Sequence, residues 1–328
     1  MKRIAALLVA ASVLWVAVAP TAKVLAAEGG VGHYSPGAIA TFIDEAPPKE
    51  TPFAVLNQFY YYNGSLDSIS QLPLARLLAS NISATAYAES PTFAYRSPLS
   101  LLGGNFAFAV VIPVVWMDVT ADVSVERTRL VDGRVVERTV TRTDTASGLG
   151  DITLIPFWWT WTMGDFKWGM RLIVNAPTGE YDVGHLANVG LNYWTFTPMI
   201  SASYLSSKYG FEITSSIGLD FNTMNNATDY QSGDVFHFEL TAAQHLPFFD
   251  LGIIGIGANF FYWGQITGDS GSGAVLGSLE GHTTGIGPVV NYISPNKNLL
   301  FEVKWLPEID VSKRLQGDAV WFKAVYVF

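Results

Sequence analysis

The most regular feature of the chain is an alternation of apolar and polar residues from Tyr209 to Asn222. Six of the seven odd-numbered residues in this 14-residue stretch are apolar, and none of the even-numbered ones is. Successive side chains of a strand point to opposite faces, so the stretch predicts a strand with one apolar and one polar face. Ordinary strands have about five or six residues, whereas roughly nine to eleven are needed to cross a bilayer. The pattern is therefore typical of a strand in a transmembrane β-barrel.

Weaker forms of the same pattern recur along the chain and predict about twelve strands. The predicted strands are 53–63, 84–96, 102–125, 135–162, 166–177, 189–206, 209–222, 231–246, 250–267, 278–294, 298–308 and 317–328. Residues 70–82, which precede the second strand, are predicted to form a short helix in the first outer loop.

The predicted connections alternate between short and long. The short ones lie at 163–165, 206–209, 247–250 and 295–298, and the long ones include 126–134, 178–188, 223–231, 268–277 and 309–317. Barrels of the bacterial outer membrane have short periplasmic turns and longer outer loops. We therefore expect an all-β fold, a single antiparallel up-and-down transmembrane β-barrel of about twelve strands.

The final strand, Trp321 to Phe328, ends on an aromatic residue and alternates. Phe322, Ala324, Tyr326 and Phe328 share one face, which we expect to be the lipid-facing one. An aromatic C-terminus on such a strand resembles the signal that barrel-assembly machinery reads. Phe322, Tyr326 and Phe328 are therefore predicted to close the barrel against the strand near 53–63 and to guide its assembly.

Composition and the N-terminal region support export to a membrane. Charged residues are 14% of the chain, against about 25% in a soluble domain. Residues 1–27 have a positive start, an apolar run and a small-residue end, as a signal peptide does. Residues 28–52, rich in Gly, Pro and Ala, are predicted to be an irregular segment that plugs the lumen or hangs as a tail, and residues 53–328 to be the barrel. A soluble exported β-sandwich or β-rich enzyme is the alternative.

Charge and cysteine content narrow the function. The net charge is −9 and cysteine is absent. An acidic chain is poorly suited to nucleic acid, whose binding depends on neutralising phosphates. Disulfides and thiolate metal sites are excluded, and no cofactor or metal site is expected.

The polar faces of the predicted strands supply the candidate functional residues. A charge facing lipid at mid-membrane costs roughly 2–4 kcal/mol, so these side chains are expected to face inward. The predicted pore-lining residues are Arg171, Glu212, Asp220, His237, Glu239, Glu302 and Lys304. His237 and Glu239 share a face and are the best acid–base or metal-ligand pair, but lumen lining is the favoured interpretation, and we expect no enzyme.

Several short stretches, in this order, resemble one family. They are 28–30, 34–37, 148–151 (GLGD), 175–182 (NAPTGEYD), 190–198 (GLNYWTFTP), 228–233 (TDYQSG), 265–274 (QITGDSGSGA) and 285–288 (GIGP). The chain is similar to the exported family labelled putative MetA-pathway of phenol degradation, which includes sphingosine-induced outer-membrane proteins. The resemblance implies an outer-membrane barrel that passes hydrophobic or aromatic compounds, and it implies no defined catalytic residue.

Two functions follow as expectations. The first is an outer-membrane channel for small hydrophobic, in particular aromatic, compounds, which cross by passive diffusion through a partly plugged barrel. The second is a structural or stress-related outer-membrane barrel that conducts nothing. Expected partners are outer-membrane lipid, the barrel-assembly machinery and small hydrophobic solutes.

Overall fold

Twelve antiparallel strands form a closed barrel in the structure, a computed structural model that describes residues 23–24, 27–40, 52–66, 70–128 and 135–328. The strands of the barrel are β2 (Phe53–Ser65), β4 (Leu77–Leu101), β5 (Gly104–Val111), β8 (Thr153–Met163), β9 (Phe166–Asn175), β10 (Thr195–Leu205), β11 (Phe211–Asn222), β12 (Val235–Pro247), β13 (Ile253–Gln265), β14 (His282–Ile293), β15 (Leu299–Ser312) and β16 (Gln316–Val327). The last strand closes the barrel on the first, with Lys323 opposite Gln58. The predicted fold and the predicted closing pair are confirmed.

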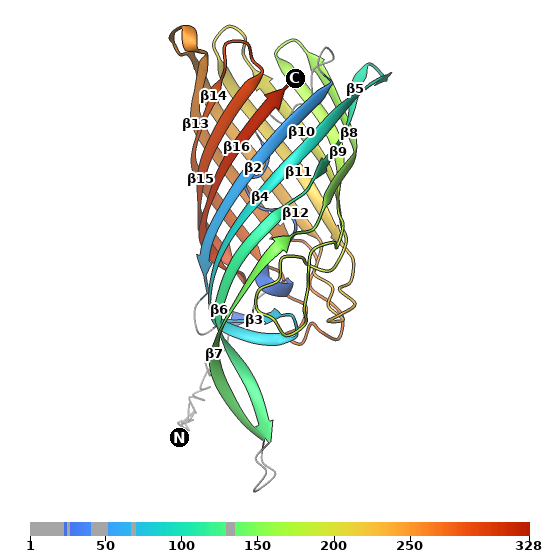
Figure 1. The fold of residues 1–328 in the computed structure, drawn as a ribbon, viewed down its shortest axis with the longest axis vertical. Coiled ribbons are helices and arrows are strands. Elements are labelled where there is room, and N and C mark those ends of the chain that lie inside the picture. Colours follow the sequence, from blue (N-terminus) through green and yellow to red (C-terminus); the bar gives the residue numbers. More distant parts are fainter. Residues whose placement is uncertain (1–22, 25–26, 41–51, 67–69, 129–134) are drawn as a thin grey trace, which may run out of the picture.

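The two ends of the barrel differ in their connections. At the end that carries the C-terminus, turns of two to five residues join β4 to β5, β8 to β9, β10 to β11, β12 to β13 and β14 to β15. Long loops gather at the opposite end, where the described N-terminal part of the chain also lies (Figure 1). Short turns mark the periplasmic end of an outer-membrane barrel, so the end with the long loops is the outer one.

Two predicted strands are each broken in the structure. Residues 102–125 form β5 and then β6 (Val114–Thr128), and residues 135–162 form β7 (Val135–Leu149) and then β8. Pro113 has no amide hydrogen for the ladder, which explains the first break. The hairpin of β6 and β7 extends beyond the barrel at its outer end (Figure 1).

Two other expectations were wrong. Residues 70–82 are strands, because β3 (Ser70–Leu74) turns back onto the start of β4 through a left-handed Ala75 and Arg76. The connection expected to be long at 309–317 has only three residues, because β15 continues to Ser312 and β16 begins at Gln316. The remaining short elements are β1 (Lys23–Val24), which pairs in parallel with β3, and the 3-10 turns η1 (Glu28–Gly30) and η2 (Phe249–Leu251). Of the predicted signal peptide, residues 1–27, the structure describes only 23–24 and 27, and the other residues lie outside the described part of the chain.

The outer surface of the wall is apolar and aromatic. On β11, Ile213, Ile217 and Phe221 are between 43% and 47% exposed, while Glu212 and Asp220 on the opposite face are buried. Near the periplasmic end, the indoles of Trp161 and Trp168 stack with 4.1 Å between ring centroids. Amphipathic aromatic rings are typical of the two interfaces of a membrane. This surface fits a barrel embedded in lipid. Among the described residues, no helix has the length and apolar character to cross a membrane.

Candidate functional site

All seven residues predicted to line a pore face the interior of the barrel. Each of them is at most 8% exposed, and five have 0% or 1% exposure. They are Arg171 on β9, Glu212 and Asp220 on β11, His237 and Glu239 on β12, and Glu302 and Lys304 on β15. Their inward placement follows from the alternation of each strand, but most of them do not border open space.

Glu239 and Lys304 instead grip a segment of the chain that runs inside the barrel, residues 33–40, which we call the strap. Glu239 Oε1 accepts hydrogen bonds from the amides of Gly37 (3.0 Å) and Ile39 (3.3 Å) and from the Tyr34 hydroxyl. Lys304 Nζ donates to the carbonyls of the same Gly37 (3.0 Å) and Ile39 (2.6 Å). The two side chains therefore satisfy the backbone of the strap from both sides, as the strands of a sheet would.

Other strands hold the strap from around the wall. Trp321 Nε1 on β16 donates to Pro36 O at 3.0 Å, and Gln58 Nε2 on β2 donates to Ala38 O at 3.0 Å. The Tyr34 ring stacks on His237 of β12 with centroids 3.7 Å apart. The strap is thus bound to strands that lie far apart around the barrel.

Gly37 fits a place that no other residue fills without strain. Its φ is +89°, in the left-handed region, and a Cβ there would lie 2.1 Å from Leu306 Cδ1 and 2.9 Å from Trp321 Nε1. Left-handed backbone costs a residue with a side chain about 1–2 kcal/mol. A glycine is therefore required where the strap crosses β15 and β16.

Asp151 anchors the outer end of the strap. It lies in the break between β7 and β8, where its Oδ2 contacts His33 Nε2 at 2.9 Å and accepts the Leu191 amide at 2.7 Å, and its Oδ1 accepts the Gly179 amide at 2.8 Å. Burial raises the pKa of Asp151, but the hydrogen bond and charge of His33 and the two amides outweigh it and lower the pKa overall. One carboxylate thus joins the strap to the long loop between β9 and β10.

Glu28 and Asp269 join the chain just before the strap to the outer loops. Glu28 accepts hydrogen bonds from Tyr181 (2.9 Å), Asn225 (2.9 Å) and Thr228 (3.2 Å), and burial raises its pKa despite these donors. Asp269 accepts the Ala27 amide at 2.9 Å and the Tyr230 hydroxyl at 2.7 Å. The outer mouth is therefore closed by loops tied to one another and to the N-terminal segment through buried carboxylates.

The remaining interior charges pair with one another. Asp220 lies 3.3 Å from His237, Glu212 lies 2.6 Å from His245, and Glu302 lies 3.6 Å from Lys304. The first two pairs connect β11 with the neighbouring β12, and the third lies along β15. Within the described part of the chain, no group of three or more His, Asp or Glu side chains is arranged to hold a metal ion.

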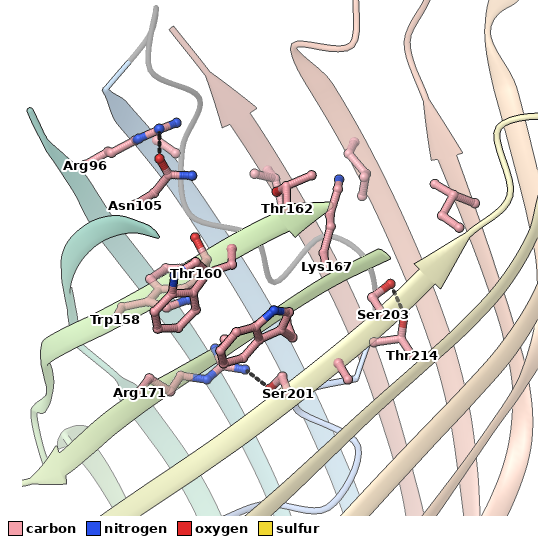
Figure 2. A pocket seen from close by; sticks show the side chains of 18 of the residues that line it. Arg96, Asn105, Trp158, Thr160, Thr162, Lys167, Arg171, Ser201, Ser203 and Thr214 are labelled. Carbon is pink, nitrogen blue, oxygen red and sulfur yellow. Dashed lines mark hydrogen bonds between the residues drawn. The ribbon is translucent and has the colours of Figure 1, made fainter. Parts of the chain in front are cut away.

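Between the strap and the periplasmic end lies a cavity of about 580 Å³. Arg96, Lys167, Arg171 and Lys297 line it together with serine and threonine hydroxyls and Trp158. Figure 2 shows Arg96, Trp158, Lys167 and Arg171 reaching from β4, β8 and β9 into one space, with Arg171 hydrogen-bonded to Ser201 and Ser203 to Thr214. The interior therefore has a filled middle and an open periplasmic half.

The sequence predicted the inward-facing residues of the barrel strands better than the segment that those residues bind inside the barrel. Lys167 shares its strand face with Arg171 and was available to the same parity argument. The stretches 34–37 and 148–151 carried the family resemblance, but the contacts of His33, Tyr34, Gly37 and Asp151 were not predicted, because they depend on where the irregular segment runs. On the last strand, Phe322, Tyr326 and Phe328 are 41–62% exposed on the outer face, and the rings of Tyr326 and Phe328 meet edge to face at 4.9 Å.

Comparison with known proteins identifies a matching family and solved structures with a similar fold. The sequence pattern of the family described as "Putative MetA-pathway of phenol degradation" matches residues 66–324. The COG4313 outer membrane channel from Pseudomonas putida F1 superposes with a TM-score of 0.57 at 14% identity, over 87% of this chain and 98% of that one. The β domain of the Bordetella autotransporter BrkA gives 0.44 at 10% identity, over 84% and 100% of the two chains. No curated protein matches. The molecule is a β-barrel of the bacterial outer membrane.

Proposed function

Because the chain belongs to the family described as "Putative MetA-pathway of phenol degradation", we propose that it is an outer-membrane channel through which small hydrophobic, in particular aromatic, compounds cross by passive diffusion. Residues 28–52 act as a partial plug in this proposal. The structure describes 28–40 and 52 of that segment. The observation that carries the proposal is the strap, which occupies the middle of the barrel above a preformed cavity.

The contacts of the strap suit a plug that moves. They are hydrogen bonds and ring stacking rather than covalent links. Glu239 and Lys304, for example, hold the strap through hydrogen bonds to only a few of its backbone atoms. Each such bond contributes about 0.5–1.5 kcal/mol, or up to about 3 kcal/mol when one partner is charged. Local displacement of the strap therefore costs far less than opening the strand ladders.

Uptake into liposomes tests the proposal. Vesicles that contain the purified protein should take up labelled hydroquinone faster than protein-free vesicles, and the excess should be smaller for glycerol, which has no ring. Vesicles made with heat-denatured protein serve as the matched control. Equal hydroquinone uptake with native and denatured protein would contradict the proposed function.

One observation favours a barrel that conducts nothing. Glu239 and Lys304 are 0% exposed and Glu302 is 1% exposed, so the interior is filled at their level. A planar-bilayer trace distinguishes the two functions, since a channel with a movable strap should show brief openings and a structural barrel should stay silent.

The terminal residue is expected to serve assembly rather than passage. The Phe328 amide donates to Phe53 O at 3.4 Å and its ring lies outside the barrel. Deleting Phe328 should lower the amount of folded barrel in the outer membrane severalfold and leave the conductance of the folded fraction unchanged. Phe328→Tyr, which keeps an aromatic ring, should restore the amount. Normal membrane levels of the deletion variant would show that the residue has no assembly role.

A further inference from the structure

The periplasmic cavity is basic, although the protein as a whole is acidic. Arg96, Lys167, Arg171 and Lys297 are among the residues that line it, and none of its lining residues is Asp or Glu. The carboxylate of Glu212 is bonded to one lining residue, Thr214, whose hydroxyl donates to Glu212 Oε1 at 2.6 Å, and Glu212 Oε2 lies 2.6 Å from His245. The cavity therefore offers positive charge to a solute and hides the adjacent carboxylate. We propose that it is a binding site for small aromatic carboxylates.

Arg171 is held ready to accept a carboxylate. Its guanidinium lies 5.5 Å from the centroid of the Trp158 ring, and its Nη2 donates to Ser201 at 3.3 Å. Trp158 is the partner of Arg171 across the β8–β9 ladder, so the strands place the cation on the indole. A guanidinium held on an aromatic face keeps its flat donor edge directed, and this edge matches the geometry of a carboxylate.

The wall beside Arg171 leaves room for a flat ring. Lys167, Gly169 and Arg171 point inward in succession along β9, and Gly169 brings no side chain between the two cations. A Cβ at Gly169 would lie 2.7 Å from Trp159 O, so the gap is built into the fold. Trp158 and Thr160 face this gap from β8, opposite Arg171 and Gly169. An aromatic ring over Gly169 would meet the indole at its side, between two cationic residues whose Cα atoms lie about 13 Å apart along the strand.

The size and lining suit a small molecule with an apolar body and one charge. About 580 Å³ lies in the range of ligand pockets, roughly 300–1,000 Å³. Alongside the cations, Val325 and Ile253 contribute apolar surface. Clefts lined by one sign of charge also concentrate oppositely charged solutes. A neutral aromatic compound would keep the ring contacts but lose the attraction to the cations. Acetate would keep the attraction to the cations but lose the ring contacts.

Binding to the detergent-solubilised barrel tests this site by titration calorimetry with benzoate, benzyl alcohol and acetate. Benzoate should bind at least tenfold more tightly than either of the other two. Arg171→Met and Lys167→Met should each weaken benzoate binding at least tenfold, and Trp158→Leu should weaken benzoate more than acetate. Lys313→Met, which removes one positive charge at the outer end of the barrel, is the matched control and should bind benzoate as the parent does.

The outcomes separate this inference from the proposed function. Binding at the site is measured directly, and only the passage of the bound solute through the barrel rests on the proposed function. Equal binding of benzoate and benzyl alcohol, or unchanged benzoate binding in Lys167→Met, would overturn the site. Lys167 is partly exposed and makes this variant readable even if Arg171→Met does not fold. Hydroquinone uptake by a protein that does not bind benzoate would refute the site alone. Tight benzoate binding without any uptake would refute the channel alone.

Discussion

Replacing Gly37 with alanine should hold the barrel open for a much larger fraction of the time. The new methyl group would lie 2.1 Å from Leu306 Cδ1, on a backbone whose φ is +89°. Left-handed strain and overpacking together cost the seated strap about 2–4 kcal/mol. The barrel wall itself is unchanged, so the cost falls on the closed state alone. Since every 1.4 kcal/mol is tenfold, the open probability in single-channel recordings should rise at least roughly 30-fold.

Gly32→Ala is the matched control for this variant. A Cβ at Gly32 has Trp263 Cζ2 as its nearest neighbour at 3.9 Å, which is ordinary contact. The same substitution five residues earlier should therefore leave the open probability near that of the parent. Hydroquinone uptake should follow the same order. A silent trace from Gly37→Ala in correctly folded barrels would show that the strap does not gate the lumen, and would favour the structural barrel.

Replacing Asp151 with asparagine should loosen the outer mouth and remove a defined part of the acid sensitivity. The pKa of Asp151 is lowered in the folded protein from its ordinary value of 3.8. A carboxylate shifted in this direction contributes stability that is complete above 3.8 and is lost as the pH falls through the lowered pKa. Asparagine has one acceptor oxygen for three donors, so the variant should lose about 2–4 kcal/mol near pH 7.

The temperature at which the folded band unfolds on a gel, measured from pH 7 to pH 2, checks this expectation. The parent should lose stability below about pH 4, and Asp151→Asn should start lower and lose less over that range. Glu28 shifts the other way, since its pKa is raised and a proton taken up there favours the folded state. Asp182→Asn, an exposed change in the same outer loop, is the control and should resemble the parent. Identical pH curves for Asp151→Asn and the parent would refute the anchoring role.

The alternation of side chains was enough to predict the wall of this barrel. The alternation from Tyr209 to Asn222, most of which forms β11, placed Glu212 and Asp220 inside and Ile217 outside, because a slip of one residue would put charges into lipid. Composition located most turns, through Gly and Asp. It failed at 112–113, where Pro113 lies within an apolar run, and at 150–152, where the predicted strand 135–162 was continued across Gly150 and Asp151.

The strap and the cavity inside the barrel could not be predicted from the sequence, for a different reason. The strap is recognised through its backbone, by Glu239 and Lys304, and backbone groups are the same in every residue. Lys304 was correctly placed on the inner face, yet its partner lies 267 positions earlier in the chain. The cavity was missed because it depends on strands from several parts of the chain meeting around Gly169.

The path of the strap also sets an order of events during folding. The chain runs from the outer loops, where Glu28 meets Asn225 and Thr228, down to Thr241 in mid-barrel, while β2 begins at the periplasmic end. The ladder between β16 and β2 then encloses this path. If that seam formed first, the segment would have to be threaded through a finished ring, a step that protein chains rarely take. Residues 33–40 are therefore expected to lie inside the incomplete barrel before β16 pairs with β2.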